Sequence, residues 1–206
     1  MTALLQPESR ASFAQYEEML AASDVKLEFR DGEVVAMAGG SETHSLVSTN
    51  AARQLGNQLS NFPCRVYNSD MKVRVEATQQ AFFPDASVVC DPSKFTDLHR
   101  RSLLNPCLIA EVLSESTAAY DRGKKFWHYR HLESLHTYLL ISTDEALVEV
   151  YERMDGGDWR LRTYDGLEAE IRLEHLELCI PVAGLYAKTS LDGAAASIPL
   201  STLPQA

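Results

Sequence analysis

A single acidic residue inside an apolar segment constrains this chain more than any other feature. Glu111 lies in CLIAEVLS (107–114), whose apolar neighbours predict a strand that is buried on both faces of a sheet. An ionised carboxylate there is costly unless a cation or hydrogen-bond donors compensate it. Taken alone, Glu111 has two interpretations: a buried ion pair with an arginine, or a ligand of a metal ion.

A second acid favours the metal ion. Asp85 follows Pro84 and precedes the apolar run ASVVC, so it too is expected against the core. Two carboxylates on neighbouring strands repel one another unless a positive charge lies between them, and a hard divalent cation with oxygen ligands meets that need. With only two such acids, water and a backbone carbonyl would complete the shell, as Mg²⁺ prefers when phosphate oxygens enter it.

The position of Lys125 follows from chain geometry. The strand runs roughly 10 Å from Glu111 to its end near Ser114, at about 3.3 Å per residue. A helix that starts near Ser116 and runs back reaches Lys125 after roughly 13 Å, at about 1.5 Å per residue. Lys125 is therefore expected at the height of Glu111, with an exposed helix lysine as the alternative. Lys124 points about 100° away and is expected in solvent.

The remaining pattern predicts a mixed sheet flanked by helices, an α/β (α+β) class. Helices are expected over 12–23, 41–61 and 118–132, with a hairpin turn at Asp31-Gly32. Strands are expected over 64–76, 81–90, 107–114, 136–142, 146–153, 159–165 and 168–174, and 93–101 reads as a short helix or a loop. We expect one domain over 12–188, a flexible N-terminus over 1–11 and a disordered tail over 189–206.

The charge of the chain disfavours a protein that binds the phosphate backbone of nucleic acid without sequence preference. The formal net charge is −10 and the pI about 5.0, whereas such proteins usually carry a basic face. A bound metal ion and a local basic patch can offset the global charge. The candidates for that patch, for which a solvated surface is the alternative, are Arg100, Arg101, Arg122, Lys124 and Arg130.

The cysteines and the termini point to the cytoplasm. Cys64, Cys90, Cys107 and Cys179 form no CxxC pair, so we expect buried free thiols, with neither a zinc site nor a disulfide framework. The chain has no apolar run of membrane-spanning length and no signal peptide at its start, which predicts a cytoplasmic protein without a membrane partner. A cysteine–histidine hydrolase is disfavoured because no cysteine stands at an apparent helix N-terminus.

Three segments together resemble a known family. FPDASVVC, LIAEVLSESTAAYDRGKKFWHYR and LEFRDGEVVAMAGGSETHS resemble the Uma-type nucleases, a bacterial restriction-endonuclease family within the PD-(D/E)XK superfamily. The resemblance runs from about Tyr16 to Lys188. Pro84-Asp85 matches the PD element and Glu111 the second acid. The chain departs from the superfamily pattern at Leu113, where a lysine would stand, and Lys125 matches the place to which this family has moved that lysine.

The resemblance implies a restriction-endonuclease-like core and a metal-dependent endonuclease that hydrolyses phosphodiester bonds, with DNA as the expected substrate. It implies that Asp85, Glu111 and the carbonyl of Val112 hold Mg²⁺, which Mn²⁺ could replace, and that Lys125 orients the attacking water.

Three further residues fit the family pattern. Glu28 would enter the metal shell directly or through water, or else be an exposed strand residue. His44 would carry a proton or contact phosphate, or else be structural. Asp70 would help order the site, or else serve a turn. A homodimer would allow both strands to be cut. The alternative function is a non-catalytic descendant of the fold that binds a partner or nucleic acid.

Overall fold

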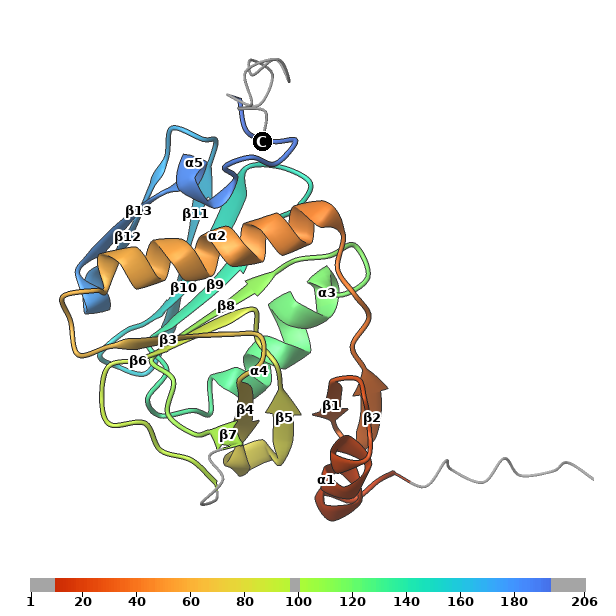
Figure 1. The fold of residues 1–206 in the computed structure, drawn as a ribbon. Coiled ribbons are helices and arrows are strands. Elements are labelled where there is room, and N and C mark those ends of the chain that lie inside the picture. Colours follow the sequence, from red (N-terminus) through yellow and green to blue (C-terminus); the bar gives the residue numbers. More distant parts are fainter. Residues whose placement is uncertain (1–9, 97–100, 194–206) are drawn as a thin grey trace, which may run out of the picture.

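The computed structural model describes residues 10–96 and 101–193, and these residues form three sheets (Figure 1). A six-stranded sheet has the order β11-β10-β9-β8-β6-β3, a five-stranded sheet the order β2-β1-β5-β4-β7, and β12 pairs with β13. The strands are β1 Leu27–Arg30, β2 Glu33–Ala36, β3 Arg65–Asn68, β4 Lys72–Val75, β5 Gln80–Phe82, β6 Ala86–Val89, β7 Ser102–Leu103, β8 Leu108–Val112, β9 Thr137–Ile141, β10 Leu147–Arg153, β11 Trp159–Asp165, β12 Glu170–Leu173 and β13 Leu178–Pro181.

Helices cover both faces of the six-stranded sheet. In that sheet β8 and β9 run parallel and the other neighbours antiparallel, so the sheet is mixed, as the sequence predicts. The long helix α2 crosses one face, and the helix that follows β8 lies on the other (Figure 1). The helical elements are α1 Phe13–Ala21, α2 Glu42–Gln58, η1 Glu76–Thr78, α3 Ala118–Tyr120, η2 Asp121–Lys125, α4 Phe126–Tyr129, η3 Glu174–Leu176 and α5 Val182–Leu185.

Side-chain alternation along β8 decides on which face the central acid lies. Leu108, Ala110 and Val112 belong to the core cluster under α2, and successive strand residues point to opposite faces. Ile109 belongs to the cluster on the other face, with the aromatic residues of α4. Glu111 therefore points towards the helix that carries Lys125, and no register shift could change this without burying the carboxylate under α2.

The hairpin β1–β2 brings another buried acid, Glu28 on β1, close to Lys125. Asp31 and Gly32 form its turn with φ of 52° and 87°, which matches the two positive φ values of a two-residue hairpin turn. The hairpin predicted at Asp31-Gly32 is thus confirmed. Strand β1 pairs with β5 through Phe29 and Ala81, and α1 packs Tyr16 against Phe29 with ring centroids 5.3 Å apart.

Two predicted strands are each divided between sheets. The stretch 64–76 forms β3 and β4, separated by a turn in which the Met71 N–H donates to Asn68 O at 3.1 Å. The stretch 81–90 forms β5 and β6, with Pro84 in the break, where a missing N–H costs no ladder bond. Polar Ser69 and Asp70 lie at the first break and Pro84 at the second, but each stretch was read as one strand. Strand β13 and the short helix α5 were also not predicted.

The helix expected over 118–132 is shorter and contains a π-helical turn. It runs as α3, then the π turn η2, then α4, and ends at Tyr129. Gly123 lies inside the π turn. Such turns insert an extra residue and are common at functional sites.

The cysteine prediction is wrong for two of the four thiols. Cys64 and Cys90 form a disulfide. They follow the antiparallel register of β3 and β6, in which Arg65 faces Val89, so the next pair outward is Cys64 with Cys90. Cys107 is a buried free thiol, as expected, and Cys179 is free but exposed.

That residues 12–188 form one domain stays a prediction. Residues 1–9 and 194–206, where flexible ends were expected, lie outside the described residues. Thr189, placed at the start of the predicted tail, is buried, and its hydroxyl donates to Tyr186 O at 2.7 Å. Within the described ranges, no helix combines the length and apolarity that a membrane crossing requires.

Candidate metal centre

Asp85, in the segment between β5 and β6, contacts the end of β8 next to Glu111. The backbone N–H of Val112 donates to Asp85 Oδ2 at 2.8 Å, so the chain segment that breaks β5 from β6 is fixed against the strand of Glu111. Asp85 has 14% of its side-chain surface exposed, and Glu111 has 6%. The site is therefore open at Asp85 and closed around Glu111.

Lys125 lies among three carboxylates. Its Nζ is 2.7 Å from Glu111 Oε1, 3.6 Å from Glu28 Oε1 and 3.5 Å from Asp121 Oδ1. Burial lowers the pKa of this lysine, but the charges of Glu111, Glu28 and Asp121 outweigh burial and raise the pKa above its usual value. Lys125 is thus an ammonium ion, which can donate hydrogen bonds and stabilise negative charge but cannot accept a proton.

Both oxygens of Glu28 are engaged. Arg30 donates from Nε and Nη2 to Oε2 at 2.8 and 2.5 Å, and the Phe83 N–H donates to Oε1 at 2.9 Å. Burial raises the pKa of Glu28, but Lys125 and Arg30 together with the Phe83 N–H outweigh it and hold the pKa below its usual value. Glu28 is fully buried rather than an exposed strand residue, and it is an anchor for Lys125 rather than an open oxygen for a metal ion.

His44 reaches the open side of the site from the first turn of α2. Its Nε2 is 3.6 Å from Asp85 Oδ2, and its backbone N–H donates to the capping hydroxyl of Ser41 at 3.2 Å. The backbone of Gly40 lies close to the His44 ring, because a Cβ at position 40 would come within 2.7 Å of His44 Nδ1. Glycine at position 40 therefore lets the ring stand where it faces Asp85.

Sequence reasoning missed three residues of this cluster. Asp121 is 4% exposed, and Tyr129, fully buried, donates from its hydroxyl to Glu111 Oε1 at 2.9 Å. Arg30 neutralises Glu28. Asp121, Lys125 and Tyr129 are spaced four residues apart, and that spacing was a usable signal, because such residues share one face of a helix.

The charge of the cluster suits a divalent cation. Among the described residues Arg30 balances Glu28, which leaves Asp85, Glu111 and Asp121 against Lys125, a formal excess of two negative charges when all three carboxyl groups are ionised. Burial raises the pKa of Asp85 and raises that of Glu111 to about 8. This is the response of carboxylates that lack a sufficient cation.

The donors also suit a hard metal ion that keeps water ligands. Asp85 Oδ1 and Glu111 Oε2 have no hydrogen-bond partner among the described residues. No three histidine, cysteine or acidic side chains in the described ranges converge closely enough to hold a metal on their own. Two carboxylates, a backbone carbonyl and water fit Mg²⁺ better than a metal that needs an all-protein cage.

Asp70, Arg122 and Lys124 make ion pairs with residues outside this cluster. Asp70 is exposed in the turn between β3 and β4, where it pairs with Lys26 at 2.7 Å, so it serves the turn rather than the site. Arg122 pairs with Glu149, and Arg100 lies outside the described residues. Lys124 is 60% exposed, largely in solvent as predicted, and pairs with Asp31.

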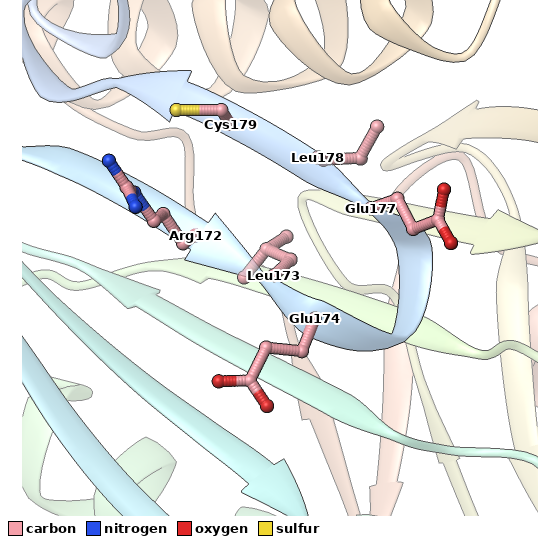
Figure 2. Close-up of a pocket in the computed structure, with 6 residues that line it drawn as sticks. All are labelled: Arg172, Leu173, Glu174, Glu177, Leu178 and Cys179. Carbon is pink, nitrogen blue, oxygen red and sulfur yellow. The ribbon is translucent and has the colours of Figure 1, made fainter.

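A hollow elsewhere on the molecule does not coincide with the acidic cluster. It has a volume of about 510 Å³ and lies against the β12–β13 hairpin (Figure 2). Its walls are Arg172, Leu173, Glu174, Glu177, Leu178 and Cys179. None of the buried acids of the cluster lines it, so it is not the candidate site.

Comparisons with known proteins identify a family and agree with the fold. The model of the Uma2 family, described as "Putative restriction endonuclease", matches residues 13–183. An uncharacterized Synechocystis protein is 38% identical over 180 residues, covering 86% of this chain and 90% of its own length. A second is 34% identical over 168 residues, covering 82% and 93%.

A solved structure shares the architecture. A crystal structure of a protein from Anabaena variabilis, described as a putative nuclease, matches with a TM-score of 0.67 at 17% identity and covers 83% of this chain and 96% of its own. At 17% sequence identity this match shows only that the two proteins share a fold. Because the family model spans most of the sequence, the chain belongs to the Uma2 family, which is described as "Putative restriction endonuclease".

Proposed function

We propose that this protein is a metal-dependent endonuclease that hydrolyses phosphodiester bonds in DNA. One observation carries the proposal: Asp85 and Glu111 each present an oxygen that has no hydrogen-bond partner among the described residues, in a cluster where the Lys125 ammonium pairs with Glu111. The family description supports a nuclease. The metal and the DNA substrate are our inference.

In this proposal Asp85, Glu111 and the carbonyl of Val112 hold Mg²⁺. The ion, when bound, lowers the pKa of a water ligand and stabilises charge at phosphorus. Lys125 donates hydrogen bonds to the attacking water or to a phosphate oxygen, and Glu28 and Asp121 hold its ammonium in place. His44, on the open side near Asp85, contacts phosphate or accepts a proton from water.

The acidic character of the chain favours a second candidate, a non-catalytic module that binds a partner. A net charge of −10 opposes tight binding to a polyanion, and Leu113 stands where the superfamily has its lysine. This candidate predicts no cleavage with any divalent metal.

A plasmid-cleavage assay distinguishes the two. Supercoiled DNA is incubated with Mg²⁺ or Mn²⁺ and either the wild type, Asp85→Asn or Asp70→Ala. Asparagine keeps an oxygen that can accept the Val112 N–H, so the fold is expected to survive. Asp70 is an aspartate in an exposed turn and serves as the matched control.

We expect metal-dependent cleavage by the wild type and by Asp70→Ala, and a loss of at least about 100-fold with Asp85→Asn, the scale of an essential electrostatic contact. Nicked circles would indicate that one strand is cut per binding event, and linear product formed without accumulation of nicked circles would indicate concerted cutting of both strands, as a dimer allows. Cleavage that persists in Asp85→Asn, or that never appears in the wild type, would contradict the proposal.

A further inference from the structure

Tyr129 makes the most specific contact of the acidic cluster that the proposed mechanism leaves unused. Its side chain is fully buried, and its hydroxyl donates to Glu111 Oε1 at 2.9 Å. The ring packs edge-on against Phe82 with centroids 5.0 Å apart and tilts against Tyr138 at 5.5 Å. The rings fix the place of the hydroxyl, since a closely packed ring has no room to turn away.

The two oxygens of Glu111 have different surroundings. Oε1 receives both Lys125 Nζ at 2.7 Å and the Tyr129 hydroxyl. Oε2 has no hydrogen-bond partner among the described residues. Two donors on one oxygen restrict rotation of the carboxylate, so that Oε2 keeps one position and stays without a donor among the described residues.

The two donors respond differently to a cation. A divalent ion at Glu111 would repel the Lys125 ammonium, so that contact weakens as the metal binds. The tyrosine hydroxyl carries no charge and is not repelled. It is therefore the donor that continues to hold Glu111 when Lys125 turns to water or phosphate.

We propose that Tyr129 is a positioning residue of the metal centre, which holds Glu111 Oε1 so that Oε2 remains available to the metal ion. This inference rests on the proposed function, because it assumes that Glu111 is a ligand. Partners that orient ligands in this way typically change metal affinity by about 10- to 100-fold when they are removed. Because the Tyr129 side chain is fully buried and its hydroxyl contacts Glu111 Oε1, its proposed role is to act through Glu111 rather than on DNA.

The test compares Tyr129→Phe with the wild type and with Tyr186→Phe. Phenylalanine keeps the ring and removes only the hydroxyl. Tyr186 is also fully buried and hydrogen-bonded, to Ser142 O and Leu147 O at 3.0 Å, but it lies outside the cluster. Free Mn²⁺ is followed by electron paramagnetic resonance during titration, plasmid cleavage gives kcat and KM, and urea unfolding gives stability.

We expect Tyr129→Phe to bind Mn²⁺ roughly tenfold more weakly, with a lower kcat at saturating metal and an unchanged KM for DNA. Tyr186→Phe should bind Mn²⁺ like the wild type even if it is less stable. Unchanged Mn²⁺ affinity and kcat in Tyr129→Phe, with a wild type that binds and cleaves, would overturn the role of Tyr129 alone. A wild type that binds no Mn²⁺ would overturn both this inference and the proposed function.

Discussion

The ammonium of Lys125 lies 2.7 Å from Glu111 Oε1, although a strand end, a loop and a π-helical turn separate the two residues along the chain. The pair is buried, and Lys125 is also within 4 Å of Glu28 and Asp121. Lys125 is thus the cation that offsets part of the negative charge of the site in the absence of a metal ion.

Removing this cation should make the fold depend on metal. Lys125→Met is expected to lose about 3–5 kcal/mol of stability, because it leaves buried carboxylates without their partner. Mg²⁺ should restore more stability to the variant than it adds to the wild type. Thermal unfolding with EDTA and with Mg²⁺ measures both, and Lys124→Met, at the exposed neighbour, is the control. Equal stabilisation of both variants by Mg²⁺ would contradict this reading.

Stability without metal should fall as the pH rises towards 8. Burial raises the pKa of Glu111 to about 8 from its ordinary 4.5, so the folded state binds more protons than the unfolded state between those values. Its contribution is fully present below about pH 4.5 and is lost as the pH passes the folded-state pKa, a change of a few kcal/mol at most.

Glu111→Gln should remove that part of the pH dependence, because glutamine does not titrate. Urea unfolding in EDTA from pH 5 to 8.5 is the measurement, with the exposed Glu145→Gln as control. A Glu111→Gln profile as steep as that of the wild type would show that another group is responsible.

Gly40 offers a way to displace His44 without touching it. A methyl group at position 40 would meet the His44 ring at 2.7 Å, whereas one at Gly39 would meet nothing within 4 Å. Gly40→Ala should therefore lower plasmid cleavage as much as His44→Ala does, with less than about 1 kcal/mol lost in stability. Gly39→Ala should cleave like the wild type. Full activity in Gly40→Ala would mean that the position of His44 does not matter.

The pair Cys64–Cys90 closes a loop of 26 residues, for which chain entropy gives a stabilisation of about 3.5 kcal/mol. Protein unfolded without reductant should show two reactive thiols, Cys107 and Cys179, and four after reduction. Thiol titration counts them, and urea unfolding of Cys64→Ser against Cys179→Ser measures the stabilisation. Four thiols before reduction would show that the disulfide does not form in the prepared protein.

The sequence was most informative where an ionisable side chain stands in a segment that is expected to be buried. Glu111 in an apolar strand and Asp85 after Pro84 could be recognised as a pair, because burying either alone is unfavourable. Lys125 could be placed by the rises of strand and helix, which are the same in all proteins. The hairpin turn at Asp31-Gly32 follows from the φ values that turn requires.

What could not be predicted depends on pairing between distant segments. Ser69, Asp70 and Pro84 lie at the two strand breaks, but only the pairing of distant strands shows that β3 and β6 join one sheet and β4 and β5 another. The disulfide requires the register of β3 with β6. The engagement of both Glu28 oxygens depends on Arg30 and on the Phe83 N–H, which lies 55 residues away in the sequence.

Asp85 and Glu111 are proposed to form one divalent-metal site, and isothermal titration of Mn²⁺ into the wild type, Asp85→Asn and Asp70→Ala tests this. We expect saturable binding to the wild type and to Asp70→Ala, and binding at least about tenfold weaker to Asp85→Asn. A wild type that releases no binding heat and shows no bound Mn²⁺ at equilibrium, or an Asp85→Asn variant that binds as tightly as the wild type, would contradict it.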